Sequence, residues 1–171
     1  HWMVHSFPTR RSSDLVHLRA VDGIRRLQEE RLQLTLSVSL HAPNDELRAR
    51  MMPVARRWPL TELLAACRDY AKATGRRISF EYALSDGVND SDACAAELAA
   101  RLRGILCHVN LIPLNPVDGG QGKRSTRERV RAFAAVLERL GINATVRRTL
   151  GADIDASCGQ LRRQETAQPA L

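Results

Sequence analysis

The sequence predicts a parallel α/β fold, on three observations. First, apolar and β-branched runs alternate with amphipathic runs, in the order strand, helix, strand, helix, strand, helix, strand, which is typical of right-handed βαβ units. Second, the run at residues 107–114, "CHVNLIPL", is mostly apolar, which predicts a strand with both faces covered. Third, a polar segment follows every strand, at the end of the sheet where parallel folds carry their sites.

We expect four parallel strands in sequential order, forming an open arc with helices outside. They are predicted at residues 34–40, 77–83, 108–113 and 143–147. The polar segments that follow them are "SLHAPND", "ALSDGVND", "LIPLNP" and "RTLGADIDASCGQL". Because the carboxyl ends of parallel strands meet at one edge of a sheet, we expect the functional site among these four segments.

The helices are predicted at residues 21–32, 59–75, 91–104 and 125–141. In the first of them Val21, Ile24 and Leu27 share one apolar face. The predicted N-caps of the other three are Thr61, Ser91 and Ser125, and the predicted stops are Gly75, Gly104 and Gly141. Glu128 follows Ser125 at the spacing of a capping box.

Composition narrows the class of protein and of partner. The formal net charge is +7, and Lys72 and Lys123 are the two lysines among 26 basic residues. This surplus favours a polyanionic partner such as nucleic acid, although a GC-rich genome would also enrich arginine. No apolar run approaches the roughly 20 residues of a membrane span, so no membrane association is expected.

The four cysteines divide into two groups. Cys67, Cys94 and Cys107 lie in apolar helical or strand contexts and are predicted to be buried, inert thiols. Cys158 lies in the polar segment "DIDASCGQL", where an exposed thiol is a better candidate for chemistry. No C-x-x-C pair is present, so we expect no metal ligands from this chain. Because the sequence has no secretory signal, we expect no disulfides and a cytoplasmic location.

Three blocks of sequence carry a resemblance: "SVSLHAPNDELRARMMPV", "CHVNLIPLNP" and "GADIDASCGQLR". Together, in order and spacing, they resemble the C-terminal half of the radical S-adenosylmethionine RNA methyltransferases that methylate C2 of adenine in ribosomal and transfer RNA. The resemblance extends from about Val21 to about Arg162. It implies that the α/β fold is the C-terminal half of a partial, incomplete parallel α/β barrel of the radical SAM type.

The resemblance also implies roles for five residues. Ser39, Leu40 and His41 match the segment that lines the S-adenosylmethionine pocket, and Asn115 matches a second contact to that cofactor. Cys158 matches the cysteine that becomes methylated and carries the methyl group to RNA. Taken alone, a histidine at a strand end more often caps backbone groups, and Asn before Pro is a common turn residue. The resemblance favours the functional interpretation of all of them.

The chemistry implied by the resemblance explains the need for a thiol. Adenine C2 is electrophilic and does not attack a sulfonium methyl group directly. In the family the cysteine takes a methyl group from one S-adenosylmethionine by displacement, and a soft thiolate suits this step. A second S-adenosylmethionine, cleaved at a [4Fe–4S] cluster, yields the radical that removes hydrogen from that methyl group, and the carbon radical adds to C2.

Some parts of the family pattern are missing. The C-x-x-x-C-x-x-C motif that binds the cluster and the second, resolving cysteine do not occur in this sequence, so we expect both in a missing N-terminal part. Leu150 and Ala152 depart from the usual Arg and Asp of the last block, and the loop "VDGGQGKRST" lacks the usual Pro–Tyr pattern. We therefore expect the isolated chain to be inactive.

The first fifteen residues are predicted to be foreign to the protein. The stretch "SFPTRRSSDL" at residues 6–15 resembles the translation of a widely used sequencing adaptor, and a native basic arm is the alternative. Residues 1–15 are thus expected to be a disordered artefact that packs against nothing. Residues 16–165 are interpreted as the C-terminal part of the methyltransferase domain, and residues 166–171 as a flexible tail.

Two classes of function remain. The first is a fragment of a methyltransferase that acts on 23S rRNA and tRNA, monomeric when intact; the second is a non-catalytic RNA-binding α/β module without the cluster. The basic residues Arg127, Arg129, Arg131, Arg147 and Arg148 suit either class, and a solvated helix face is the alternative for the first three. Cys158 favours the enzyme, because a binding module has no need of that thiol. The sequence leaves open which RNA is preferred.

Overall fold

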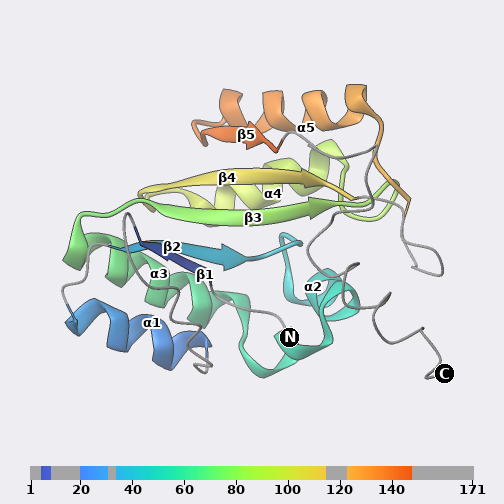
Figure 1. Cartoon of the computed structure of the whole chain (residues 1–171). Coiled ribbons are helices and arrows are strands. Elements are labelled where there is room, and N and C mark those ends of the chain that lie inside the picture. The colour runs from blue at the N-terminus through green and yellow to red at the C-terminus, as the bar shows by residue number, and fades with distance from the viewer. Residues whose placement is uncertain (1–4, 9–19, 31–33, 115–122, 148–171) are drawn as a thin grey trace, which may run out of the picture.

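A computed structural model describes residues 5–8, 20–30, 34–114 and 123–147 (Figure 1). Within them the sheet has the order β1-β2-β3-β4-β5. Its strands are β1 (His5–Pro8), β2 (Leu34–Ser39), β3 (Ile78–Leu84), β4 (Cys107–Pro113) and β5 (Ala144–Val146). Strands β2 to β5 are parallel and sequential, which confirms the predicted α/β class and strand order.

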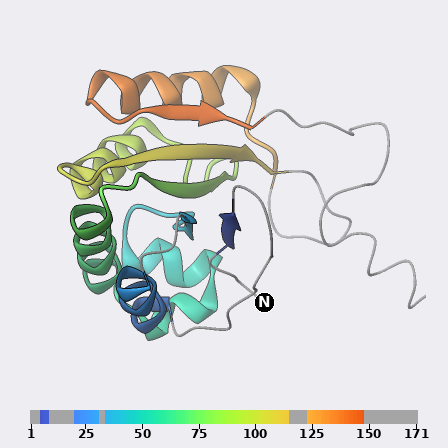
Figure 2. The same cartoon turned by 60° about the vertical axis from the view of Figure 1, so that its left-hand side comes forward.

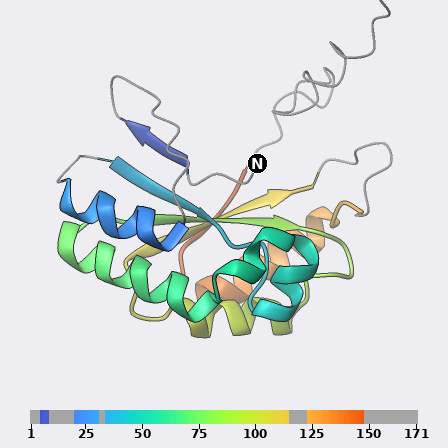
Figure 3. The same cartoon turned by 90° about the horizontal axis from the view of Figure 1, so that it is seen from below.

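The helices lie on one side of the sheet, and those after the first connect the parallel strands. The helices are α1 (Ala20–Glu29), α2 (Asp45–Met51), α3 (Leu60–Thr74), α4 (Asp92–Leu102) and α5 (Arg127–Arg139), with a 3₁₀ helix at Pro53–Arg57. Figures 2 and 3 show the described helices on a single face, and on the opposite face His108, Asn110 and Ile112 of β4 are half-buried. The expectation that both faces of this strand are covered stays a prediction. None of the described helices is both long and apolar enough to cross a membrane.

The core lies between this face of the sheet and the helices. Alternate residues of β3 and β4 point into it: Ile78, Phe80, Tyr82, Leu84, Cys107, Val109 and Leu111, all buried. The rings of Tyr82 and Phe133 lie 5.2 Å apart, which joins β3 to α5. Burying one large apolar side chain contributes roughly 1.5–3 kcal/mol, so the packing of this face against the helices stabilises the sheet.

The start of α3 differs from the prediction. Thr61 is not its N-cap: the helix begins at Leu60 after Pro59, whose ring carries no acceptor that could cap the helix. The Leu60 N–H donates instead to Asp45 Oδ1 at 2.7 Å. A carboxylate distant in sequence therefore satisfies the first helical donor, which a local pattern does not reveal.

The start of α5 also differs by one residue. Its N-cap is Thr126, whose hydroxyl accepts from Arg129 N at 3.1 Å, and not Ser125. Ser125 is buried and donates to Asp90 Oδ2 at 2.7 Å. The cap predicted for α4 is confirmed, since Ser91 Oγ accepts from Cys94 N.

Strand β1 contradicts the expectation that residues 1–15 pack against nothing. His5–Pro8 pairs antiparallel with β2, and His5 lies opposite Ser37. The edge of β2 offers unpaired N–H and C=O groups, and an extended segment of almost any sequence satisfies them through its own backbone. This pairing does not test the adaptor origin of the segment, which stays a prediction.

Candidate functional site

The face of the sheet opposite the helices carries two rows of polar residues. Strand register aligns Ser37, Ser79 and His108 in one row and Ser39, Glu81, Asn110 and Thr145 in the next. These seven residues, called the polar face below, alternate along each strand with the core residues. One hydrogen bond crosses from β4 to β3, where Asn110 Nδ2 donates to Glu81 Oε2 at 2.9 Å, and one lies within β3, where Ser79 Oγ donates to Glu81 Oε1 at 3.1 Å.

Glu81 and His108 are the ionisable groups of the polar face. Among the described residues no cation forms a salt bridge with Glu81, and neutral donors hold its carboxylate. Ser79 gives its proton to Glu81, so its oxygen accepts from His108 Nε2 at 3.3 Å. His108 Nδ1 is buried and has no partner within the described part. Burial, and then the charge of Arg77, lower the pKa of His108.

His41 forms a turn directly beyond β2. Its φ of 58° is in the left-handed region, which costs a non-glycine residue about 1–3 kcal/mol, and its exposure is 7%. The imidazole continues the strand pairing, because Ala83 N donates to His41 Nδ1 at 3.0 Å, just after Leu40 N donates to Glu81 O. A neutral ring that accepts at Nδ1 carries its proton on Nε2. Burial, and then the charge of Arg48, lower the pKa of His41 to about 4, so the ring is neutral near pH 7.

Asn89 holds this turn and the end of β3 together. Its Nδ2 donates to His41 O at 2.7 Å and to Ala83 O at 2.6 Å, and its Oδ1 accepts from Ser85 N at 2.7 Å. Its own carbonyl accepts from the Tyr82 hydroxyl at 2.9 Å. Asn89 is fully buried, and its carboxamide uses both donors and its acceptor. Sequence reasoning selected the segment "ALSDGVND" but not this residue.

Asp90 fixes the same loop to the start of α5. Its Oδ1 accepts from Gly87 N at 3.1 Å, and its Oδ2 accepts from Ser125 Oγ. The carboxylate is almost fully buried. The loop after β3 is therefore clamped on one side to His41 and on the other to α5.

The structure brings some of the predicted site residues together. Ser39 is half-buried on the polar face, and His41 lies at the end of the same strand. Leu40 is 1% exposed and packs in the core, and its N–H donates to Glu81 O, which leaves its backbone carbonyl as the group that a ligand could contact. Asn115 and Cys158 lie outside the described residues, so their predicted roles stay predictions.

The remaining cysteines are in the core or at its margin. Cys67 and Cys107 are buried, and burial raises the pKa of their thiols to about 12 and about 11. Cys94 is half-buried, so the prediction of burial is confirmed for two of these three thiols. Within the described part of the chain, no group of three or more His, Cys, Asp or Glu side chains could hold a metal ion. These residues do not fit an iron–sulfur cluster, which needs thiolate ligands.

The arginines proposed for RNA binding are not equivalent. Arg129 on α5 forms an ion pair with Asp92 on α4 and thus joins two helices. Arg127, Arg131 and Arg147 are exposed. Arg148 lies outside the described residues. An exposed guanidinium remains available to phosphate, whereas Arg129 already has a carboxylate partner.

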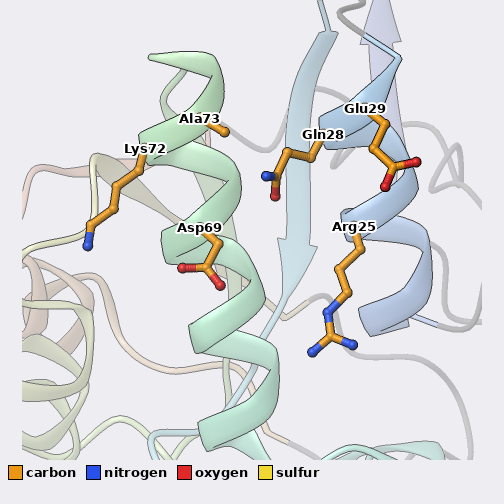
Figure 4. Close-up of a pocket in the computed structure, with 6 residues that line it drawn as sticks. All are labelled: Arg25, Gln28, Glu29, Asp69, Lys72 and Ala73. Atoms are coloured by element: carbon orange, nitrogen blue, oxygen red, sulfur yellow. The ribbon is translucent and has the colours of Figure 1, made fainter.

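A surface groove lies away from the polar face, between α1 and α3 (Figure 4). It is lined by Arg25, Gln28, Glu29, Asp69, Lys72 and Ala73. Its lining mixes both signs of charge and belongs to the outer faces of two helices. It is therefore separate from the site at the strand ends.

Two solved structures resemble this arrangement. The chain superimposes on a radical SAM methyltransferase from Sphaerobacter thermophilus with a TM-score of 0.79 and 57% identity, covering 82% of this chain and 41% of that one. A domain of a pyruvate-formate lyase-activating enzyme from Bacteroides vulgatus shares the fold, with a TM-score of 0.60 at 18% identity and 74% coverage of each chain. Parallel strands, helices on one face and a polar opposite face thus define a partial α/β barrel of the radical SAM class.

Sequence comparison identifies the group within that class. A probable dual-specificity RNA methyltransferase RlmN from Pelotomaculum thermopropionicum is 61% identical over 145 residues, covering 84% of this chain and 39% of the relative. The corresponding protein from Symbiobacterium thermophilum is 57% identical over 143 residues, covering 83% of this chain and 38% of that relative. No protein-family model matches. The chain is therefore homologous to one part of the RlmN-type radical SAM RNA methyltransferases, as predicted, and spans about two fifths of their length.

Proposed function

We propose that this chain is the C-terminal part of the catalytic domain of an RNA methyltransferase that methylates C2 of adenine in 23S rRNA and tRNA. The observation that carries the proposal is the 61% identity over 145 residues to a relative named as a dual-specificity RNA methyltransferase. The [4Fe–4S] cluster would be bound by the part of the relatives that this chain does not span. The parent protein would act in the cytoplasm as a monomer.

The described residues fit S-adenosylmethionine as a ligand. His41 is a neutral donor through Nε2, and Ser39 adds a hydroxyl at the same strand end. The polar face offers a carboxylate, an amide and hydroxyls to the ribose and amino-acid groups of the cofactor. Leu40 would contribute its backbone carbonyl, and Asn115 would add an amide. When bound, S-adenosylmethionine supplies an electrophilic methyl group and, after reductive cleavage, a radical.

Cys158 is proposed to carry the methyl group. After its thiol loses a proton, Sγ would form a bond to the methyl carbon while the bond from that carbon to the sulfonium breaks, leaving a methyl thioether. A thiol with a raised pKa is a poor nucleophile near neutral pH, which argues against Cys67 and Cys107 in this role.

The RNA partner is proposed to be bound in part by exposed arginines. Arg127 and Arg131 on α5 and Arg147 after β5 are exposed, and the chain has a net charge of +7. Contacts of this kind neutralise phosphates and make the affinity depend on salt concentration. Phosphate contacts position the RNA and do not read its base sequence.

A chimera tests the proposal. Residues 16–171 of this chain would replace the matching part of the Pelotomaculum thermopropionicum relative, and methylation of adenine C2 in rRNA and tRNA would be measured by mass spectrometry of digested RNA. We expect methylation by the chimera and none after Cys158→Ala, with S-adenosylmethionine cleavage retained. Cys94→Ala is the matched control, because that thiol is half-buried in α4, and it should keep activity. A folded chimera that cleaves the cofactor without methylating RNA would show the proposal to be wrong.

A further inference from the structure

The turn that carries His41 is not one that a histidine adopts by itself. Its φ of 58° is positive, and among the described residues that are not glycine no other has a positive φ. The residue is also buried, so water does not solvate its carbonyl or its ring. Such a conformation persists when neighbouring groups overdetermine it.

The hydrogen bonds point to one side chain. Asn89 Nδ2 donates to the carbonyl of His41 itself and to the carbonyl of Ala83, whose N–H in turn donates to His41 Nδ1. The Asn89 carboxamide thus holds both the backbone of His41 and the residue that orients its ring. Its third bond, from Ser85 N to Oδ1, fixes the amide orientation, because only the oxygen can accept there.

We propose that Asn89 is the positioning residue for His41, holding it in the left-handed turn and in the tautomer that presents Nε2–H as a donor to S-adenosylmethionine. Asn89 acts through His41 and needs no contact with the cofactor. The role of His41 toward the cofactor rests on the proposed function above, whereas its turn and its tautomer follow from the hydrogen bonds of Asn89 and Ala83.

The first test uses this chain without any cofactor. With ¹⁵N-labelled histidine, long-range ¹H–¹⁵N NMR near pH 7 should show His41 as a single tautomer, protonated at Nε2 and accepting at Nδ1, and His41→Asn assigns the signal. In Asn89→Ala the two nitrogen shifts should move toward the averaged values of a mobile imidazole. Val136→Ala, a core change on α5, is the matched control and should leave the His41 signals in place. Unchanged His41 shifts in a folded Asn89→Ala protein would overturn the proposal.

A second variant covers the case in which Asn89→Ala does not fold. Asn89→Asp has the same shape and keeps the acceptor for Ser85 N, but an ionised carboxylate cannot donate to the carbonyls of His41 and Ala83. It should therefore also release the tautomer of His41. A single, unaltered tautomer in Asn89→Asp would contradict the proposal in the same way.

The second test measures binding of S-adenosylmethionine to the chimera described above. Asn89→Ala should weaken binding about tenfold, the scale of one lost hydrogen bond to a ligand. His41→Asn should weaken it to a similar extent, and the double variant should be little worse than either. If Asn89→Ala binds as well as the parent chimera, the proposal is overturned. If the parent chimera itself does not bind, the proposed function fails, and the NMR result alone decides the role of Asn89.

Discussion

Lowering the pH should destabilise the protein through His41. Burial lowers the pKa of this histidine in the folded chain to about 4, against 6.5 for an exposed one. Below pH 6.5 the unfolded chain therefore binds a proton at this position more readily than the folded chain does. The stability is fully present above pH 6.5 and is lost as the pH falls toward 4. The loss should reach about 2 kcal/mol at pH 5 and about 3 kcal/mol when complete.

Urea unfolding between pH 7.5 and pH 4, followed by circular dichroism, measures this loss. The matched control is His41→Asn, because asparagine tolerates the left-handed turn, can accept from Ala83 N and does not titrate. All other ionisable groups are common to both proteins, so the difference between their two pH profiles isolates His41. Parallel profiles, or a stability that rises as the pH falls, would refute the reasoning.

Three further predictions concern other parts of the chain. Ser125→Ala should lower the free energy of unfolding by about 1–3 kcal/mol, because it removes a donor from the buried Asp90 carboxylate. Thr126→Ala, one position along, should cost only about 1 kcal/mol through loss of the helix cap; equal costs in urea titrations would contradict this contrast. Cys67→Ala should lower the free energy of unfolding by about 1–2 kcal/mol and leave methylation by the chimera intact. A stable Cys67→Ala chimera that no longer methylates RNA would count against Cys158 as the methyl carrier. Deleting β1 should expose the edge of β2 and increase self-association in light scattering, and unchanged monomeric behaviour would show that the edge is otherwise protected.

Periodicity predicted the elements well and their ends less well. The four parallel strands and the helices between them follow from apolar patterns that local sequence encodes. The cap of α3 could not be predicted from local sequence, because the N–H of Leu60 at its start donates to Asp45 of a neighbouring helix. Helix α2 was missed because it has only seven residues, too few for a periodic pattern. Ser125 and Thr126 are adjacent, and either could cap α5 on the sequence alone. Thr126 is the cap because the Ser125 hydroxyl donates to Asp90 instead.

The candidate site was predictable as a place and less so as a set of contacts. Parallel topology located it beyond the strands, and the "SLH" block named Ser39 and His41. The positive φ of His41 and the bonds that Asn89 makes to it are three-dimensional facts that link residues 48 positions apart. The signal that pointed toward Asn89 was the Asn–Asp turn in "ALSDGVND", which marks a loop without naming its partner.

The alternation between the core and the polar face has a consequence for how the gene tolerates change. In a saturation scan that reads protein abundance, substitutions in β3 should be harmful at the even-numbered residues Ile78, Phe80, Tyr82 and Leu84, which are buried. They should be mild at the odd-numbered Glu81 and Ala83, which are half-buried, and the buried Ser79 is the exception. In β4 the parity should reverse, since its buried residues carry odd numbers. A second scan, made in the chimera and reading RNA methylation, should add the opposite positions Glu81, His108 and Asn110 to the harmful set. Comparing the two scans would separate, residue by residue, the face that maintains the abundance of the protein from the face proposed to bind the cofactor.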